Sequence, residues 1–226
     1  MFISKLRPVA ISQAEHQKLA GTLALLWGNA AFERPPIARE SFVQGVALHD
    51  RAYGALDNLP IGGIPEADWL ALTRRGFAQA WADPAAELIA KLHLQRLASY
   101  GSSPERQAAA TELARAAEQH ARRHGLDPAL FARVDRITNL CDLIAFDFCF
   151  EAPAEGAVVV FPRNDGDEQV RVRYRVAGGT IEVDPWPFAV EAHAGYLVGY
   201  QLAGYPEALE PVVVEYMLIH ASFDRL

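Results

Sequence analysis

The chain has 226 residues, 51% of them apolar, and a formal net charge of −7 at pH 7. This length suits one large domain, or a domain with an appendage, and the apolar content is enough for a core. The acidic balance argues against a nucleic-acid-binding protein, because such proteins usually present a basic face to the phosphates.

The sequence also argues against export and membrane insertion. The first residues, MFISKLRPVAISQ, lack the apolar run of a signal peptide. No stretch approaches the roughly 18 apolar residues that span a bilayer. Cys141 and Cys149, the only cysteines, both lie in an apolar helical pattern that is typical of reduced core residues. We therefore expect a cytoplasmic protein with no nucleic-acid or membrane partner.

Helical signals extend over the first two thirds of the chain. Ser12 and Glu15 form an S-x-x-E capping box, in which each side chain satisfies a free backbone N–H of the other residue. Asp-Pro pairs at 83 and 127 mark two further helix starts, with Asp as the N-cap and Pro at the first helical position. The predicted helices cover residues 12–28, 41–57, 66–72, 74–81, 83–100, 104–124 and 127–150.

The pattern changes near Glu151. From residue 170 to 176, valine or tyrosine alternates with arginine, a period of two that is typical of a half-buried strand. The predicted strands cover residues 157–161, 170–176, 180–183, 193–202 and 212–223. We therefore predict an α+β chain in which a mainly α-helical body, residues 1–150, is followed by a small antiparallel β-rich C-terminal module, residues 151–226, packed on it.

Residues with metal-ligand chemistry lie on the inward faces of four predicted helices. They are His16, the pair His49-Asp50, His93 and Asp142. A buried carboxylate is costly without a partner, and imidazole and carboxylate both bind divalent Fe, Mn, Zn or Ni. Each position alone fits a hydrogen-bonded core residue equally well. The presence of such residues on the inward faces of four helices favours a divalent metal ion as cofactor.

The order His, His-Asp, His, Asp resembles the HD superfamily of metal-dependent phosphohydrolases. In that superfamily a helical bundle gathers the H…HD…D residues around one metal ion. The resemblance implies that His16, His49, Asp50 and Asp142 hold the first metal ion. It also implies that His93 is an added metal ligand or a phosphate contact.

A closer resemblance is to the uncharacterised bacterial domain-of-unknown-function family 3891. It rests on these segments: Gln13-x-x-His16, His49-Asp50 with Tyr53 and Asp57, His93-x-x-Arg96-Leu97, Asp142-Leu143-Ile144 and the Pro-Trp-Pro-Phe run at 185–188. The resemblance covers nearly the whole chain and implies a fold and a metal site, but no known substrate. Arg51, Ala52 and Tyr53 depart from the family pattern, which bears on the substrate pocket more than on the metal ligands.

Further side chains are predicted to act beside the metal ion. Asp50 or Asp57 is placed to orient a water molecule or take its proton. The planar fork of Arg96 suits a phosphate group. An interhelical salt bridge for Arg96 and a loop cap for Asp57 are the simpler interpretations. Asp147 competes with Asp142 for the inward position.

Three functions fit these observations. The first is a metal-dependent hydrolase of a phosphorylated small molecule, with nucleotides among the candidates. The second is a non-catalytic protein that binds a ligand or partner, for which a His16 turned into an apolar pocket would be the sign. The third is a di-metal oxygenase. The β-rich part is expected to cover the site or to form a homodimer interface.

Overall fold

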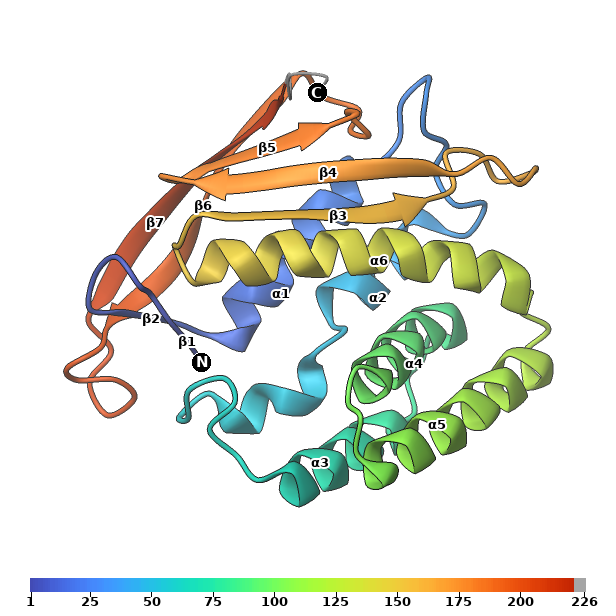
Figure 1. Ribbon diagram of the computed structural model, residues 1–226, viewed down its shortest axis with the longest axis horizontal. Helices are drawn as coiled ribbons and strands as arrows, with labels where there is room; N and C mark the ends of the chain where they lie inside the picture. Colours follow the sequence, from blue (N-terminus) through green and yellow to red (C-terminus); the bar gives the residue numbers. More distant parts are fainter. Residues whose placement is uncertain (222–226) are drawn as a thin grey trace.

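A curled sheet encloses two of the helices, and the other helices pack against that pair (Figure 1). The computed structural model describes residues 1–221. Its elements in chain order are β1 (Phe2–Ile3), β2 (Val9–Ile11), α1 (Gln13–Leu26), α2 (Arg39–Ala47), the 3₁₀ helix η1 (Arg51–Leu56), α3 (Glu66–Ala78), α4 (Pro84–Ser99), α5 (Pro104–Arg123), α6 (Pro128–Cys149), β3 (Ala154–Val160), β4 (Val170–Ala177), β5 (Thr180–Asp184), β6 (Ala192–Gln201) and β7 (Pro211–His220).

The sheet has seven strands in the order β1-β2-β6-β7-β5-β4-β3. Strands β5 and β7 pair in parallel, and all other neighbours are antiparallel. The predicted fold class is therefore wrong, because the sheet is mixed and is not a small C-terminal module on a helical bundle. Its first two strands come from the start of the chain. They are too short to show an alternating pattern, so the sequence did not reveal them.

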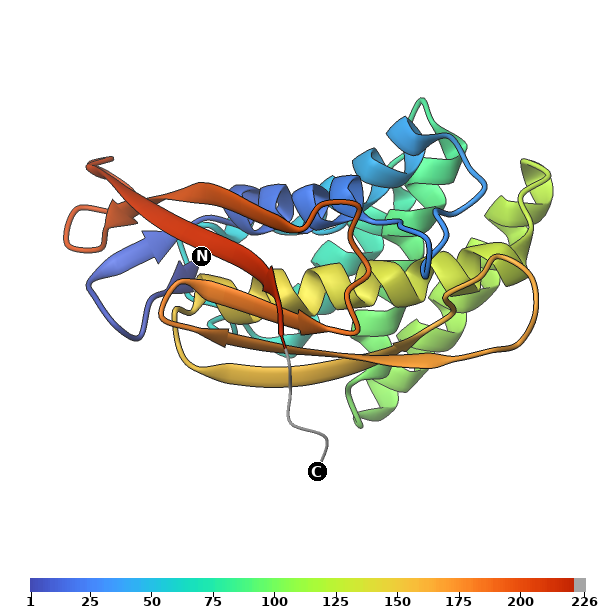
Figure 2. The same ribbon diagram turned by 90° about the horizontal axis from the view of Figure 1, so that it is seen from above.

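Helices α1 and α6 lie lengthwise next to each other inside the curl of the sheet (Figure 2). Helix α6 packs on β3 and β4, while α1 packs on β6. Helices α2 and α4 contact this pair, and α5 packs on the outside of α4. No helix among residues 1–221 is long and apolar enough to cross a membrane.

Helix starts that carry a side-chain cap are confirmed. Asp83 accepts hydrogen bonds from the backbone N–H groups of Ala85 and Ala86, and Asp127 accepts one from that of Ala129. Ser12 caps α1 by accepting from the backbone N–H of Glu15. The Glu15 carboxylate does not close the predicted capping box. It accepts from the backbone N–H of Val198 at 2.8 Å, which ties α1 to β6.

The predicted helix over residues 41–57 is wrong in its second half. Helix α2 ends at Ala47, and His49 and Asp50 lie in the turn before η1. The His49 ring contributes to this ending, because its Nδ1 lies 2.6 Å from the carbonyl oxygen of Val46 and takes over a helical acceptor. The two helices predicted over residues 66–72 and 74–81 form instead one helix, α3, which ends at Ala78.

The apolar strands predicted after residue 151 are present with shifted ends. Of the strand predicted over residues 212–223, the structure contains Pro211–His220, and residues 222 and 223 lie outside the described residues. Cys141 and Cys149 are free thiols in the core, as predicted. Burial raises the pKa of both thiols, which keeps them protonated.

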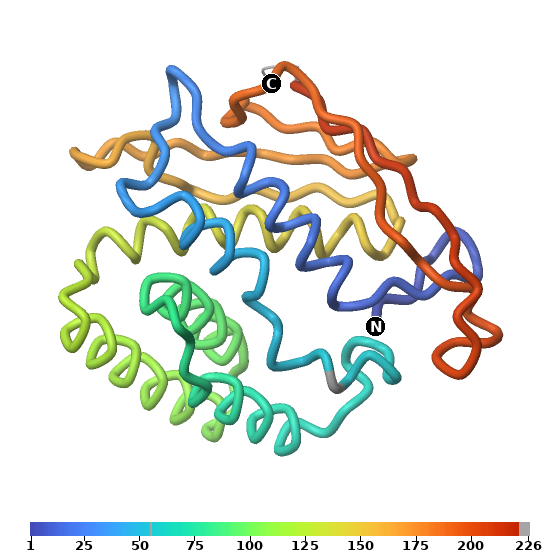
Figure 3. Tube along the Cα trace, turned by 180° about the vertical axis from the view of Figure 1, so that it is seen from behind, coloured from blue at the N-terminus to red at the C-terminus, as the bar shows by residue number. Residues whose placement is uncertain are grey.

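Two glycines let the helices approach closely. A Cβ atom on Gly21 of α1 would lie 2.6 Å from the Cβ of Ala47 at the end of α2. A Cβ on Gly45 of α2 would lie 2.7 Å from the Cβ of Ile89 on α4. Figure 3 shows α1 and α2 side by side. These contacts set the spacing between the helices that carry the polar core residues.

We expect Gly21→Ala to lower the free energy of unfolding by about 1–3 kcal/mol, because a methyl group at this crossing forces α1 and α2 apart. Thermal and urea denaturation measure this loss. Gly54→Ala is the matched control, since a Cβ there meets nothing within 4 Å. Equal stability of the two variants would show that the helix crossing tolerates a wider spacing.

Candidate metal centre

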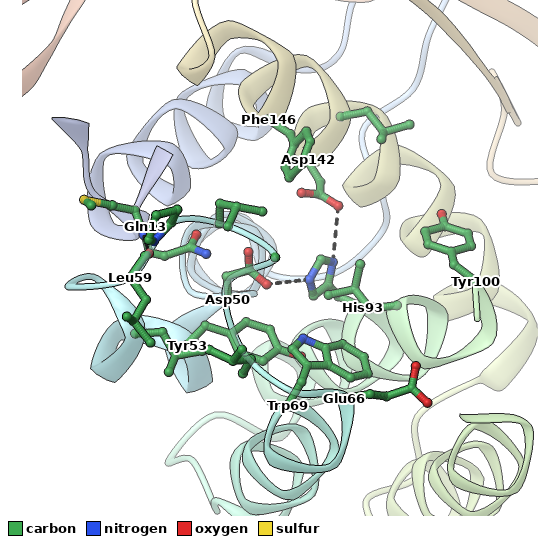
Figure 4. A pocket seen from close by; sticks show the side chains of 18 of the residues that line it. Gln13, Asp50, Tyr53, Leu59, Glu66, Trp69, His93, Tyr100, Asp142 and Phe146 are labelled. Carbon is green, nitrogen blue, oxygen red and sulfur yellow. Dashed lines mark hydrogen bonds and ion pairs between the residues drawn. The ribbon is translucent and has the colours of Figure 1, made fainter. Parts of the chain in front are cut away.

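Four separate elements bring five ionisable side chains to one buried place. His16 comes from α1, His49 and Asp50 from the turn after α2, His93 from α4 and Asp142 from α6. Their exposed fractions are between 0% and 7%. Figure 4 shows Asp50, His93 and Asp142 from the side of the adjoining cavity. The structure thus gathers all the residues that were predicted as metal ligands.

Four donor atoms face one another at similar distances. His16 Nε2 lies 3.1 Å from His49 Nε2, 3.6 Å from Asp50 Oδ2 and 3.4 Å from Asp142 Oδ1. His49 Nε2 lies 3.3 Å from Asp142 Oδ1 and 3.8 Å from Asp50 Oδ2. Tetrahedral bonds of about 2.0–2.2 Å separate ligand atoms by about 3.3–3.6 Å. Three of these five distances fall in that range and the other two lie close to it, and His16, His49 and Asp142 form a group that could hold one divalent ion.

The tautomer of His49 suits a metal ligand. Its Nδ1 lies 2.6 Å from the carbonyl oxygen of Val46, which can only accept a hydrogen bond. The proton is therefore assigned to Nδ1, and the lone pair of Nε2 faces His16 and the two carboxylates. A backbone carbonyl behind the ligating imidazole is a common way to fix the ring of a metal-bound histidine.

The electrostatics of the centre favour a positive charge among these groups. Burial alone would raise the pKa of Asp142, but the surrounding His93, His16 and His49 hold that pKa well below its usual value. Burial likewise acts to raise the pKa of Asp50, and His93 and His49 lower it instead. Burial acts to lower the pKa of His49, but Asp50 and Asp142 raise it. The lowered pKa values keep both carboxylates ionised, and the raised pKa of His49 keeps positive charge beside them.

Each carboxylate turns one oxygen to the centre and the other to a hydrogen-bond partner. Asp50 Oδ1 lies 2.7 Å from His93 Nε2, and Asp142 Oδ2 lies 3.3 Å from Arg96 Nη1. The inward atoms are Asp50 Oδ2 and Asp142 Oδ1. The outer partners hold each carboxylate in the orientation that a metal ion needs.

His93 lies close enough to His49 and Asp50 to share a metal ion with them, since one ligand atom from each of the three residues lies within 4.8 Å of the other two. Both ring nitrogens of His93, however, already have partners. Arg96 Nη2 lies 3.1 Å from Nδ1 and can only donate, so the ring proton is assigned to Nε2, which faces Asp50. This arrangement makes His93 a donor to Asp50 more readily than a metal ligand.

Arg96 does not line the cavity beside the centre. Its guanidinium binds Asp135 at 3.2 Å, Asn139 at 2.9 Å and Asp142 at 3.3 Å, in addition to His93. These contacts match the interhelical salt bridge that the sequence left as the simpler interpretation. The predicted phosphate-binding fork is therefore engaged within the protein.

Two aspartates lie away from the centre. Asp57 accepts from the backbone N–H of Gln13 at 2.8 Å and lies 3.4 Å from the amino group of Met1. It thus satisfies a free donor at the start of α1. Asp147 accepts from the Tyr174 hydroxyl at 2.7 Å on another face of α6. Between the two candidates on α6, it is Asp142 that meets the histidines.

A cavity of about 560 Å³ adjoins the centre, and Asp50, His93 and Asp142 line it. Tyr53 and Trp69 also line it, with their rings stacked at 6.1 Å. The sequence did not single out Gln13 as a site residue, although it lies one turn before His16. Its side chain also lines the cavity (Figure 4).

The fold and the buried His/Asp cluster define a protein with a centre that could hold a metal ion. A family described as "Protein of unknown function (DUF3891)" matches residues 4–196, so the chain belongs to this family and the predicted resemblance to it is confirmed. No curated protein and no solved structure matches the chain.

We expect Arg96→Lys to weaken metal binding about 10–100-fold, because lysine keeps the charge but cannot contact Asp135, Asn139 and Asp142 together. Calorimetric titration of chelator-treated protein with Zn²⁺ and Mn²⁺ measures the affinity. The control is Arg74→Lys in the exposed pair with Glu112, which should leave the affinity unchanged. Unchanged affinity in both variants would mean that Asp142 holds its orientation without Arg96.

Proposed function

We propose that the chain is a metal-dependent hydrolase of a phosphorylated small molecule, with one Fe, Mn, Zn or Ni ion held by His16, His49, Asp50 and Asp142. The observation that carries this proposal is the position of the centre. Four donor atoms converge in a buried cluster, and two of the residues that supply them, Asp50 and Asp142, line a cavity of about 560 Å³ that a small substrate could enter.

The residues around the centre have complementary roles in this proposal. A divalent ion there would supply a more acidic water and polarise a phosphoryl oxygen. The Asp50 carboxylate, which lines the cavity and accepts a hydrogen bond from His93 at 2.7 Å, can accept a proton from water. In hydrolysis the water oxygen bonds to phosphorus, the bond from phosphorus to the alcohol oxygen breaks, and the alcohol leaves with a proton. His16 and His49 have no direct part in this proton transfer.

One ion is favoured over two. The groupings His16-His49-Asp142 and His49-Asp50-His93 share His49. With Nδ1 of His49 bound to Val46, only its Nε2 is left for a metal ion. This supports a hydrolase over a di-metal oxygenase. The order of the proposed ligands along the chain resembles that of the HD superfamily of phosphohydrolases, which also supports hydrolysis.

A non-catalytic binding protein has less support. The sign expected for it was a His16 turned into an apolar pocket. In the structure His16 Nε2 faces His49, Asp50 and Asp142 within 3.6 Å. All four donor atoms therefore take part in the cluster.

The proposal is tested with Asp142→Asn, which keeps the shape of the side chain but removes the charge that faces the histidines. We expect near-stoichiometric metal in the wild-type protein by elemental analysis, and at least a roughly 100-fold loss of metal affinity in the variant. Hydrolysis of p-nitrophenyl phosphate by the metal-loaded protein should fall in parallel.

Asp147→Asn is the matched control, because it changes the same residue type on the same helix and keeps an acceptor for the Tyr174 hydroxyl. It should retain both metal and activity. Wild-type protein that takes up no Fe, Mn, Zn or Ni after reconstitution would refute the proposal. Metal uptake without hydrolysis of any phosphate ester would leave the centre in place but refute the enzyme.

A further inference from the structure

The walls of the cavity above the centre are mainly apolar. The aliphatic and aromatic side chains that form them include Leu56, Ile61, Ile64, Leu97, Leu143 and Phe146. The Tyr53 hydroxyl is bound to Thr73 Oγ1 at 2.8 Å, so its ring contributes an apolar surface. A ligand that fills this space must be largely apolar itself, because hydroxyl groups placed against such walls would lose their hydrogen bonds to water.

The charges around the cavity do not suit a polyphosphate. Among the described residues that line it, the positive groups are Arg106 and the amino group of Met1. Arg106 lies 3.4 Å from Glu66, and the Met1 amine lies 3.4 Å from Asp57, so both already face carboxylates. The metal centre itself contributes two carboxylates. One phosphoryl group at the centre is compatible with this balance, whereas the several charges of a nucleotide polyphosphate are not.

Two cavity-lining residues, Gln13 and Arg106, have a buried polar atom without a hydrogen-bond partner among the described residues, but Arg106 Nε faces the Glu66 carboxylate at 3.4 Å. The Oε1 atom of Gln13 is buried and accepts no hydrogen bond from the described residues. The residue is only 5% exposed, and Figure 4 shows its carboxamide extending into the cavity beside Asp50. A buried acceptor without a donor costs free energy, so such atoms in folded proteins usually have a partner. A donor on a bound ligand would satisfy it.

We propose that the cavity binds the organic group of the substrate, and that this group is an apolar ring system with one N–H or O–H donor directed at Gln13 Oε1. This inference rests on the proposed function and narrows it to phosphate monoesters of largely apolar alcohols, in place of nucleotides. The phosphoryl group lies at the floor beside Asp50 and Asp142, and the ring lies between the apolar walls.

The ring site is tested without the metal ion, so that its result is independent of catalysis. Indole and benzofuran have nearly the same shape, but only indole has an N–H donor. We expect chelator-treated protein to bind indole about 5- to 10-fold more tightly than benzofuran in calorimetric titrations. Adenosine 5′-monophosphate should bind more weakly than either. Failure to bind indole, or preference for the nucleotide, would overturn the proposal.

The role of Gln13 is tested with Gln13→Leu, which keeps the size of the side chain and removes the acceptor. The preference for indole over benzofuran should disappear in this variant, while thermal stability should not fall. Gln17→Leu is the matched control: Gln17 is also buried on α1 with an unpartnered Oε1, but it does not line the cavity. It should keep the preference. A preference that survives Gln13→Leu would refute the hydrogen bond.

The location is tested with Leu97→Trp, which fills the cavity from α4, against Leu92→Trp on the same helix outside the cavity. Only Leu97→Trp should lose indole binding. If Leu97→Trp still binds indole, the ring of the ligand does not lie in this cavity. In the metal-loaded wild-type protein, kcat/KM for 3-indoxyl phosphate should exceed that for adenosine 5′-monophosphate at least 100-fold. Indole binding without hydrolysis would contradict the proposed function alone, whereas faster hydrolysis of the nucleotide would contradict the ring site alone.

Discussion

The arrangement of the whole molecule depends on two carboxylates and two imidazoles that meet at one buried point. Such a group is stable only if each member is oriented and the negative charge is balanced. The carbonyl of Val46 fixes His49, while His93 and Arg96 hold the outer oxygens of Asp50 and Asp142. The centre thus has a supporting layer of hydrogen bonds, and this layer in turn joins the turn after α2 to α4 and α6.

The fold explains why this support is available. Helices α1 and α6 are enclosed by the sheet, and the close crossings at Gly21 and Gly45 bring α2 against α1 and α4. The His/Asp cluster lies where these helices meet, and the cavity with Gln13 in its wall adjoins it. The same helix packing therefore forms both the His/Asp cluster and the cavity beside it. Polar side chains line the cavity at the cluster, and apolar side chains line the rest of it.

Features with a local cause could be predicted from the sequence. Ser12, Asp83 and Asp127 cap helices within their own first turns, and inward-facing polar residues stand out in apolar helical patterns. Features that depend on distant partners could not be predicted. The parallel pairing of β5 with β7 has no signature in either strand. The four partners of Arg96 and the missing partner of Gln13 Oε1 likewise become visible only when the elements are packed together.

The pairing of β2 with β6 joins Val9 to Gln201 and so links segments from nearly opposite ends of the described chain. Helix α1, with His16, follows directly from β2. Contacts between such distant residues form late, because a very long loop must close first. During synthesis on the ribosome, the first histidine of the centre is therefore anchored to the sheet only after β6 has emerged. The order of synthesis thus delays completion of the buried His/Asp cluster until most of the surrounding protein is able to shield it.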